Sequence, residues 1–248
     1  MVILSIFFFI TAIFYSSVGF GGGSTYLALL LIWKIPYYIF PIIALFCNII
    51  VVTGSSIHYI RTGNLNLKLL IPYLIGSIPF AFLGASISIE KELFEILLFF
   101  VLMVARIFLL IESKSFNKDQ IKIRQIPKIL SIFVGSVIGF ISGIVGIGGG
   151  IFLSPFLFLM KAGYPKHIAT TASLFILINS IFGVAGQLTK NIVFNEFLNF
   201  WPLFLVALIG GQIGNFLNIK FLSNKMLALI TSLLVIFVAA RMGFRLLS

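Results

Sequence analysis

The sequence predicts an all-α, polytopic membrane protein with about eight transmembrane segments in two homologous repeats, the first helix of each broken by glycine. Three observations lead to this prediction. Of the 248 residues, 60% are hydrophobic and 9% charged, and the mean hydropathy is +1.21. The apolar runs repeatedly reach the length of about 20 residues that crosses a bilayer as a helix. A glycine motif occurs twice inside such runs.

The two copies of the glycine motif read VGFGGG at positions 18–23 and VGIGGG at positions 145–150, so every position of one copy has an equivalent in the other. Glycine weakens a helix by about 1 kcal/mol per residue and permits backbone angles that other residues avoid. Unwound backbone at membrane depth is tolerated only where protein buries it or water reaches it. Each copy therefore predicts a broken helix that lines a cavity.

The first repeat is predicted to occupy residues 1–111, and its segments fall at 2–33, 38–59, 67–89 and 93–111. The segment at 2–33 is too long for one straight crossing, in agreement with a break at its glycines. A hydrophilic linker follows at residues 112–128, where five Lys and Arg residues face two acidic ones. This basic linker is the natural boundary between the repeats.

The second repeat is predicted at residues 129–248, with segments at 129–160, 168–188, 197–219 and 226–241. Its similarity to the first repeat extends beyond the glycine motif. Gly54 pairs with Gly183, and Gly84 pairs with Gly214, at offsets only slightly larger than that of the motif itself. Duplicated halves with broken helices are typical of secondary transporters, whose substrate site lies between the halves.

The Lys and Arg residues between the segments predict the orientation. With eight simple crossings, the linker shares one side with Arg61, Lys68, Lys190, Arg241 and Arg245, and the other side holds Lys34, Lys91, Lys161, Lys166, Lys220 and Lys225. The richer side faces the cytoplasm, so both termini and the linker are expected there, in a bacterial inner membrane. If each glycine segment is instead a hairpin that crosses twice, the two halves are inverted relative to each other.

The two glycine motifs, the stretch from Gly163 to Ser173 and the GxxxG of Gly210 and Gly214 together resemble one family over nearly the whole chain. The chain resembles the TauE/SafE family of sulfite exporter-like permeases. The resemblance implies a secondary carrier for sulfite, a sulfonate or a related organic anion, without an ATP-binding domain. It also implies coupling to the proton gradient. Ser24-Thr25-Tyr26 departs from the aliphatic run that usually follows the motif in this family.

The candidate substrate-binding residues are glycines, amides and hydroxyls in the apolar segments. The glycines form an anion-binding nest of backbone N–H groups, or allow close helix packing. The hydroxyls donate to an anion, cap the helix or bond back to a helix carbonyl, and the amides contact substrate or another helix. The set comprises Gly19, Gly21, Gly22, Gly23, Asn48, Gly146, Gly148, Gly149, Gly150, Thr170, Thr171, Ser173 and Asn179.

Other functional classes find little support in the sequence. The apolar segments hold no cluster of His, Asp, Glu or Cys residues, so we expect no enzyme, no metal site and no cofactor. Cys47 lies in an apolar run and is interpreted as a small buried hydrophobe. The basic residues flank membrane segments and form no nucleic-acid-binding stripe. The expected partners are a small anion and the lipid bilayer; a homo-oligomer, a passive anion channel and a membrane subunit of a larger complex remain open.

Overall fold

The computed structural model describes residues 1–114, 123–190, 196–197 and 199–217. The described residues contain helices and no β-strand, and four of the helices are long and apolar enough to cross a membrane. The polytopic all-α prediction is therefore confirmed, while the predicted segment at 226–241 lies outside the described residues. The helices are α1 (Val2–Ser16), α2 (Gly23–Ile32), α3 (Phe40–Arg61), α4 (Leu67–Ser86), α5 (Lys91–Lys114), α6 (Lys128–Val145), α7 (Gly150–Leu159), α8 (Pro165–Gln187) and α10 (Trp201–Leu217), with the 3₁₀-helix η1 (Tyr37–Ile39) before α3.

Both predicted helix breaks are confirmed. α1 and α2 are separated by the first glycine motif, and α6 and α7 by the second. The backbone is left-handed at the break glycines, with φ of +86° at Gly22, +89° at Gly146 and +81° at Gly149. A side chain clashes with the following carbonyl in this conformation, so glycine is needed here. The short helices α2 and α7 each have 10 residues and begin at the same position of the motif, its last glycine.

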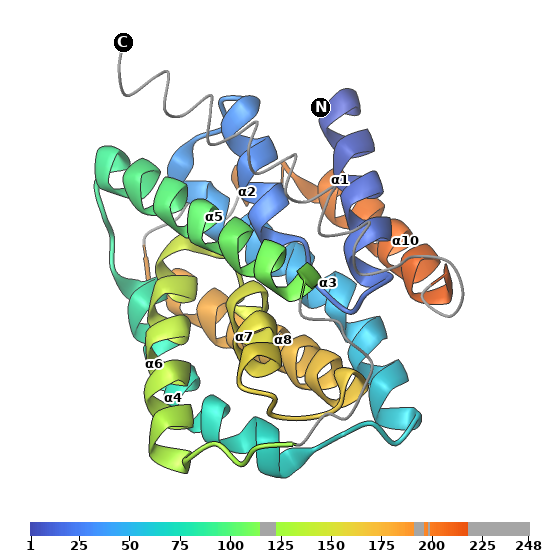
Figure 1. Cartoon of the computed structure of the whole chain (residues 1–248). Helices are drawn as coiled ribbons and strands as arrows, with labels where there is room; N and C mark the ends of the chain where they lie inside the picture. Colours follow the sequence, from blue (N-terminus) through green and yellow to red (C-terminus); the bar gives the residue numbers. More distant parts are fainter. Residues whose placement is uncertain (115–122, 191–195, 198, 218–248) are drawn as a thin grey trace.

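The chain folds back on itself at each break. The rings of Phe7 and Trp33 lie 5.6 Å apart, and the hydroxyl oxygens of Tyr15 and Thr25 lie 2.7 Å apart. Residues at similar distances along the chain before and after the first break thus lie side by side. α1 and α2 therefore form an antiparallel hairpin (Figure 1). At the second break, the backbone N–H of Arg124 donates to the carbonyl of Lys161 (3.0 Å), so α7 ends where α6 begins.

The two halves are intertwined through parallel helix pairs. A Cβ on Gly76 or Gly84 of α4 would meet the carbonyl oxygens of Ile132 or Phe140 in α6, so these two helices run parallel in close contact. In the same way, Gly210 and Gly214 of α10 lie against the carbonyls of Phe9 and Ile13 in α1. These contacts fit the repeat, because Gly84 and Gly214 are equivalent, as are Phe140 and Ile13. The first helix of each half packs on the fourth helix of the other.

The central pair, α3 and α8, shows that one half is inverted relative to the other. Ser56 near the end of α3 contacts Ser173 near the start of α8, with the hydroxyl oxygens 3.0 Å apart. Leu45 near the start of α3 lies against Gly183 near the end of α8. These repeat-equivalent helices therefore run in opposite directions. The hairpin alternative, with inverted halves, describes the structure.

The inversion changes which loops share an end of the molecule. The N-terminus lies at one end of the molecule and the start of α6 at the opposite end (Figure 1). Trp33 belongs to the N-terminal end through its contact with Phe7, and Lys161 belongs to the opposite end through its hydrogen bond with Arg124, which precedes α6. α8 starts near Lys161, so Lys190, which follows its last turn, lies at the N-terminal end. The eight-crossing arrangement placed Lys161 on the side of the membrane opposite the linker, and the N-terminus on the same side as the linker. The contacts correct this grouping; the C-terminal arginines lie outside the described residues.

Candidate functional site

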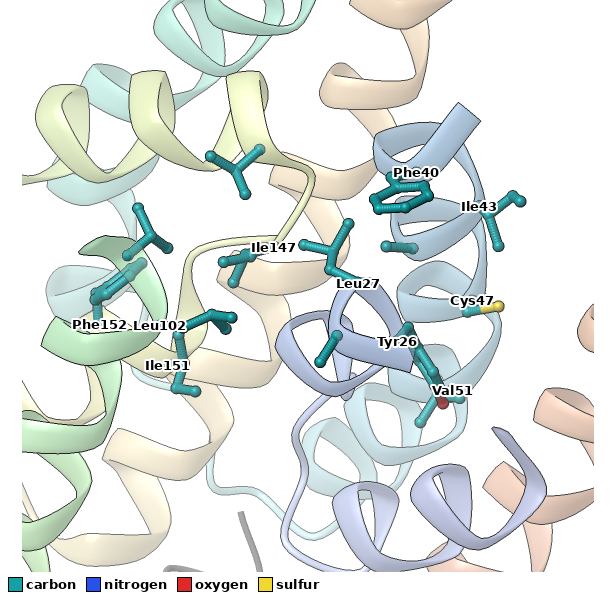
Figure 2. Close-up of a cluster of buried hydrophobic side chains, with 14 of the residues drawn as sticks. Tyr26, Leu27, Phe40, Ile43, Cys47, Val51, Leu102, Ile147, Ile151 and Phe152 are labelled. Atoms are coloured by element: carbon teal, nitrogen blue, oxygen red, sulfur yellow. The ribbon is translucent and has the colours of Figure 1, made fainter. Parts of the chain in front are cut away.

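The N-termini of the two short helices meet in the middle of the molecule. A Cβ on Gly23, the first residue of α2, would lie 2.6 Å from the carbonyl oxygen of Ile147 in the second break. In Figure 2, Leu27 of α2 lies beside Ile147, while Ile151 of α7 lies on the other side of the same apolar cluster. The two breaks, one from each half of the sequence, therefore lie against each other.

The backbone N–H groups of both short helices start without partners. In the first break, the first N–H to find a helix acceptor is that of Thr25, which donates to Gly22. In the second break it is that of Phe152, which donates to Gly149. Within the described part of the chain, no hydrogen bond is made by the N–H groups of residues 21–24 and 148–151. Such groups carry the positive end of the helix dipole and bind anions.

Asn48 connects the two breaks, as a candidate site residue should. It lies in the middle of α3 and is fully buried. Its Nδ2 donates to the carbonyl of Ile147 (3.0 Å), while its Oδ1 has no hydrogen-bond partner among the described residues. A Cβ on Gly21 or Gly23 would strike this amide, so the close approach requires glycine there. The predicted amide and the predicted glycines are brought together.

A small cavity lies at the N-terminus of α2. Its volume of about 10 Å³ is roughly the space that one water molecule needs, so a polyatomic anion enters only if the walls move apart. Of the predicted site residues, Gly21, Gly22 and Gly23 line the cavity. The full lining is Tyr15, Phe20, Gly21, Gly22, Gly23, Ser24, Ile147, Ile151 and Ile176.

The cavity includes polar residues that the sequence prediction missed. Tyr15 and Ser24 line it, and Thr25 pairs with the Tyr15 hydroxyl. All three are buried. The sequence did carry a signal for them, because Ser24 and Thr25 follow the first glycine motif where Ile151 and Phe152 follow the second. Tyr15 precedes the motif by one helical turn, and its place at the cavity depends on the hairpin of α1 and α2, which the local sequence pattern does not indicate.

The predicted residues of α8 are not gathered at the cavity. Thr170 donates to the carbonyl of Lys166 (2.8 Å), which is the alternative of back-bonding to a helix carbonyl. Ser173 bonds to Ser56 of α3. Asn179 donates to the carbonyl of Phe175 (2.9 Å); its Oδ1 and the hydroxyl of Thr171 are buried without partners in the described part of the chain. The α8 residues that contact the second break are instead Ala172, Phe175, Ile176 and Ser180.

A polar contact also lies between the second break and the end of the molecule. Gln187, at the end of α8, is 3.5 Å from the carbonyl of Gly143, which precedes the break by one turn. Its Oε1 accepts a hydrogen bond from Lys190 (3.1 Å). Partial burial lowers the pKa of Lys190 from 10.5 to about 8. No group of three His, Cys, Asp or Glu residues that could hold a metal ion occurs among the described residues.

The family model described as "Sulfite exporter TauE/SafE" matches residues 4–242. The chain belongs to the TauE/SafE family. The match spans both breaks and both central helices, so the TauE/SafE pattern covers the whole of the candidate site. It confirms the resemblance that the duplicated glycine motif suggested.

Curated relatives of this TauE/SafE chain are named as membrane transporters. The probable membrane transporter protein y4hK of Sinorhizobium fredii is 29% identical over 237 residues, which cover 94% of each chain. The probable membrane transporter protein YunE of Bacillus subtilis is 24% identical over 252 residues, covering 92% of this chain and 91% of that protein. One from Methanocaldococcus jannaschii is 30% identical over 196 residues, or 74% and 70% of the two chains. No solved structure matches the chain.

Proposed function

We propose that this TauE/SafE protein is a secondary transporter that moves a small anion, such as sulfite, a sulfonate or a related sulfur-containing organic anion, across a bacterial inner membrane. The observation that carries the proposal is the meeting of two half-helix N-termini at the centre of the molecule. Their unbonded N–H groups attract negative charge without a charged side chain. The family description supports sulfite as the first anion to test.

The inverted halves supply a way to move the anion. Repeat 1 (residues 1–111) and repeat 2 (residues 129–248), joined by the basic linker at 112–128, are proposed as the two inverted units of the transporter. Because α1 packs on α10 and α4 on α6, each bundle that moves is expected to combine helices of both repeats. In inverted-repeat transporters, one half rocks against the other about a fixed site near the bilayer centre. The glycines of both breaks and Asn48 form that site here, since Asn48 touches both breaks. The cavity, which is too small for a polyatomic anion, would then have to widen as the halves move.

The distribution of charge supports one orientation. The end of the molecule near the linker carries Arg61, Lys68, Arg124, Lys128, Lys161 and Lys166, whereas the N-terminal end carries Lys34, Lys91 and Lys190 with Glu90, Glu92, Glu95 and Glu196. The end richer in Lys and Arg faces the cytoplasm. The linker is therefore proposed to be cytoplasmic, as expected from the sequence, and the N-terminus to lie on the outer side.

The transport proposal is tested with the purified full chain in liposomes. We expect uptake of labelled sulfite to saturate and to depend on a pH gradient. An excess of unlabelled thiosulfate, sulfate or sulfoacetate should inhibit this uptake when that anion binds the same site. Uptake that does not saturate and needs no gradient would identify a passive channel. A well-folded preparation that takes up none of these anions would contradict the proposal, and tight copurification of a partner would then identify a subunit of a larger complex.

A further inference from the structure

The two glycine breaks have similar backbones but different side chains. φ is positive at Gly19 and Gly22 and at their equivalents Gly146 and Gly149, and the two breaks differ at Gly148, whose φ is positive while that of its equivalent Gly21 is not. Tyr15, Ser24 and Thr25 surround the first break. At the repeat-equivalent positions of the second half stand Ser142, Ile151 and Phe152. Two of the three hydroxyl side chains are thus replaced by large apolar ones, and the tyrosine by a much shorter hydroxyl. The breaks are related by symmetry and yet chemically unequal.

The hydroxyls of the first break are placed to donate hydrogen bonds. The oxygens of Tyr15 and Thr25 are 2.7 Å apart, and either can be the donor. One proton lies in that bond, which leaves the other proton of the pair for another acceptor. Ser24 and Tyr15 both line the cavity, directly beside the unbonded N–H groups of the first turn of α2. Backbone and side-chain donors therefore converge on one small volume.

A buried, unpaired amide oxygen is also directed at the same turn. The Oδ1 of Asn48 is fully buried, lacks a donor among the described residues, and lies against Gly21 and Gly23. Buried polar groups usually find a partner in the state for which a protein is built. An acceptor and several donors without partners at one helix start indicate that this turn is completed by something that enters it.

The second half contributes an apolar wall to the same cavity. Ile147 and Ile151 come from the second break, and Ile176 from α8. Apolar walls keep water away from the donors, and a hydrogen bond to an anion is stronger where water is excluded. The second break therefore faces the first with side chains that cover a ligand and offer it no hydrogen bond.

We propose that, within the site formed by the two breaks, the side-chain hydrogen bonds to the ligand come from the first break alone, where the hydroxyls of Tyr15, Ser24 and Thr25 recognise a small oxyanion in addition to the backbone N–H groups. The second break acts as its lid, through Ile147 and Ile151. A small oxyanion that retains one proton suits this site, because its oxygens accept hydrogen bonds from the separate donors while its O–H donates to the Oδ1 of Asn48. The inference deepens the proposed function and rests on it.

The experiment compares the two breaks by calorimetric titration of the purified full chain with sodium sulfite. Removing a donor to a charged ligand weakens binding by about tenfold or more, so we expect that loss for Tyr15→Phe and Thr25→Val. Thr25→Ser keeps a hydroxyl and should keep an affinity within about twofold of the wild type. Ser142→Ala, at the position equivalent to Tyr15, is the matched control and should bind as the wild type does.

Thermal unfolding of each variant shows whether it is folded, and the conservative Thr25→Ser keeps the test decisive if Tyr15→Phe unfolds. Equal losses in Ser142→Ala and Tyr15→Phe, or no loss in Tyr15→Phe and Thr25→Val, would overturn the inference while wild-type binding and uptake still supported an anion transporter. If the wild type neither binds nor transports sulfite or its analogues, the proposed function fails together with the inference.

Discussion

Gly22 and Gly149 precede the two short helices as their N-caps, and each lies in the left-handed region of backbone conformation. An ordinary residue is disfavoured in this conformation by about 1–2 kcal/mol. The glycines therefore act in two ways, because they fix the turn in the chain and leave the N–H groups of the first helical turn uncovered. A side chain here changes both the fold-back and the surface that meets the anion.

Gly22→Ala should lower both stability and sulfite uptake, because its Cβ would lie 3.1 Å from Thr11 and 3.2 Å from Tyr26 as well as straining the backbone. Gly63→Ala is the matched control: Gly63 also has positive φ, at +73°, but has nothing within 4 Å of a new Cβ. Uptake rates in liposomes, together with thermal unfolding, measure the difference. Equal uptake in the two variants would show that the first break does not contact the transported anion.

Single residues show where sequence reasoning succeeds and where it stops. The break glycines were predictable because glycine runs oppose a helix locally. Asn48 was predictable because an amide in an apolar segment needs a partner. Tyr15 and the α8 residues Thr170, Thr171 and Ser173 depend instead on which helix faces which. That information lies in contacts between distant segments, such as Ser173 with Ser56, and not in the local pattern.

At the scale of helices, the α4–α6 contact is built on small residues. Gly135, Gly139 and Gly143 of α6 lie against the backbone of Tyr73, Ser77 and Ala81 in α4. Small residues let helix backbones approach closely, which favours dispersion contacts inside a membrane. The sequence predicted both helices but could not predict their pairing, because a pattern of regularly spaced glycines does not indicate which helix packs against it.

Gly139→Leu should separate α4 from α6, because its Cβ would lie 2.5 Å from the carbonyl oxygen of Ser77. Overpacking of this kind costs about 1–3 kcal/mol, occasionally more, so the unfolding temperature in detergent should fall. Val137→Leu enlarges an exposed position of the same helix and should leave that temperature within about 1 °C. If the two variants unfold at the same temperature, the close packing of α4 on α6 does not contribute to stability.

At the scale of the whole molecule, the inversion of one half relative to the other depends on whether each glycine-broken segment crosses the membrane once or folds back as a hairpin. The repeat was visible in the offsets of its glycines, but a segment at positions 2–33 is compatible with one broken crossing or with a hairpin. Contacts such as Phe8 stacked on Tyr26, with ring centroids 4.6 Å apart, choose the hairpin. The first half then consists of five α-helices, α1 to α5, and because this number is odd the second half starts from the opposite end.

The arrangement predicts which cysteine substitutions share a face of the membrane. The native Cys47 is fully buried and provides a silent background. Thr62→Cys and Lys166→Cys should react with a membrane-impermeant maleimide from the same face, and Val2→Cys from the opposite face, because these exposed positions lie at those ends of the molecule. Intact cells and inverted membrane vesicles give the two readings. Labelling of Thr62→Cys and Val2→Cys from one face would restore the eight-crossing arrangement.

The exchange of packing partners between the halves also bears on how such a chain arises. α1 is held by α10, and α6 by α4, so each half places its glycine stripe against a helix that it does not itself encode. Either half alone would expose that stripe to lipid. A shorter ancestral chain that paired with an upside-down copy of itself would have met the same requirement. Duplication and fusion of its gene would then leave one polypeptide with this architecture, in which each half covers the glycine stripe of the other.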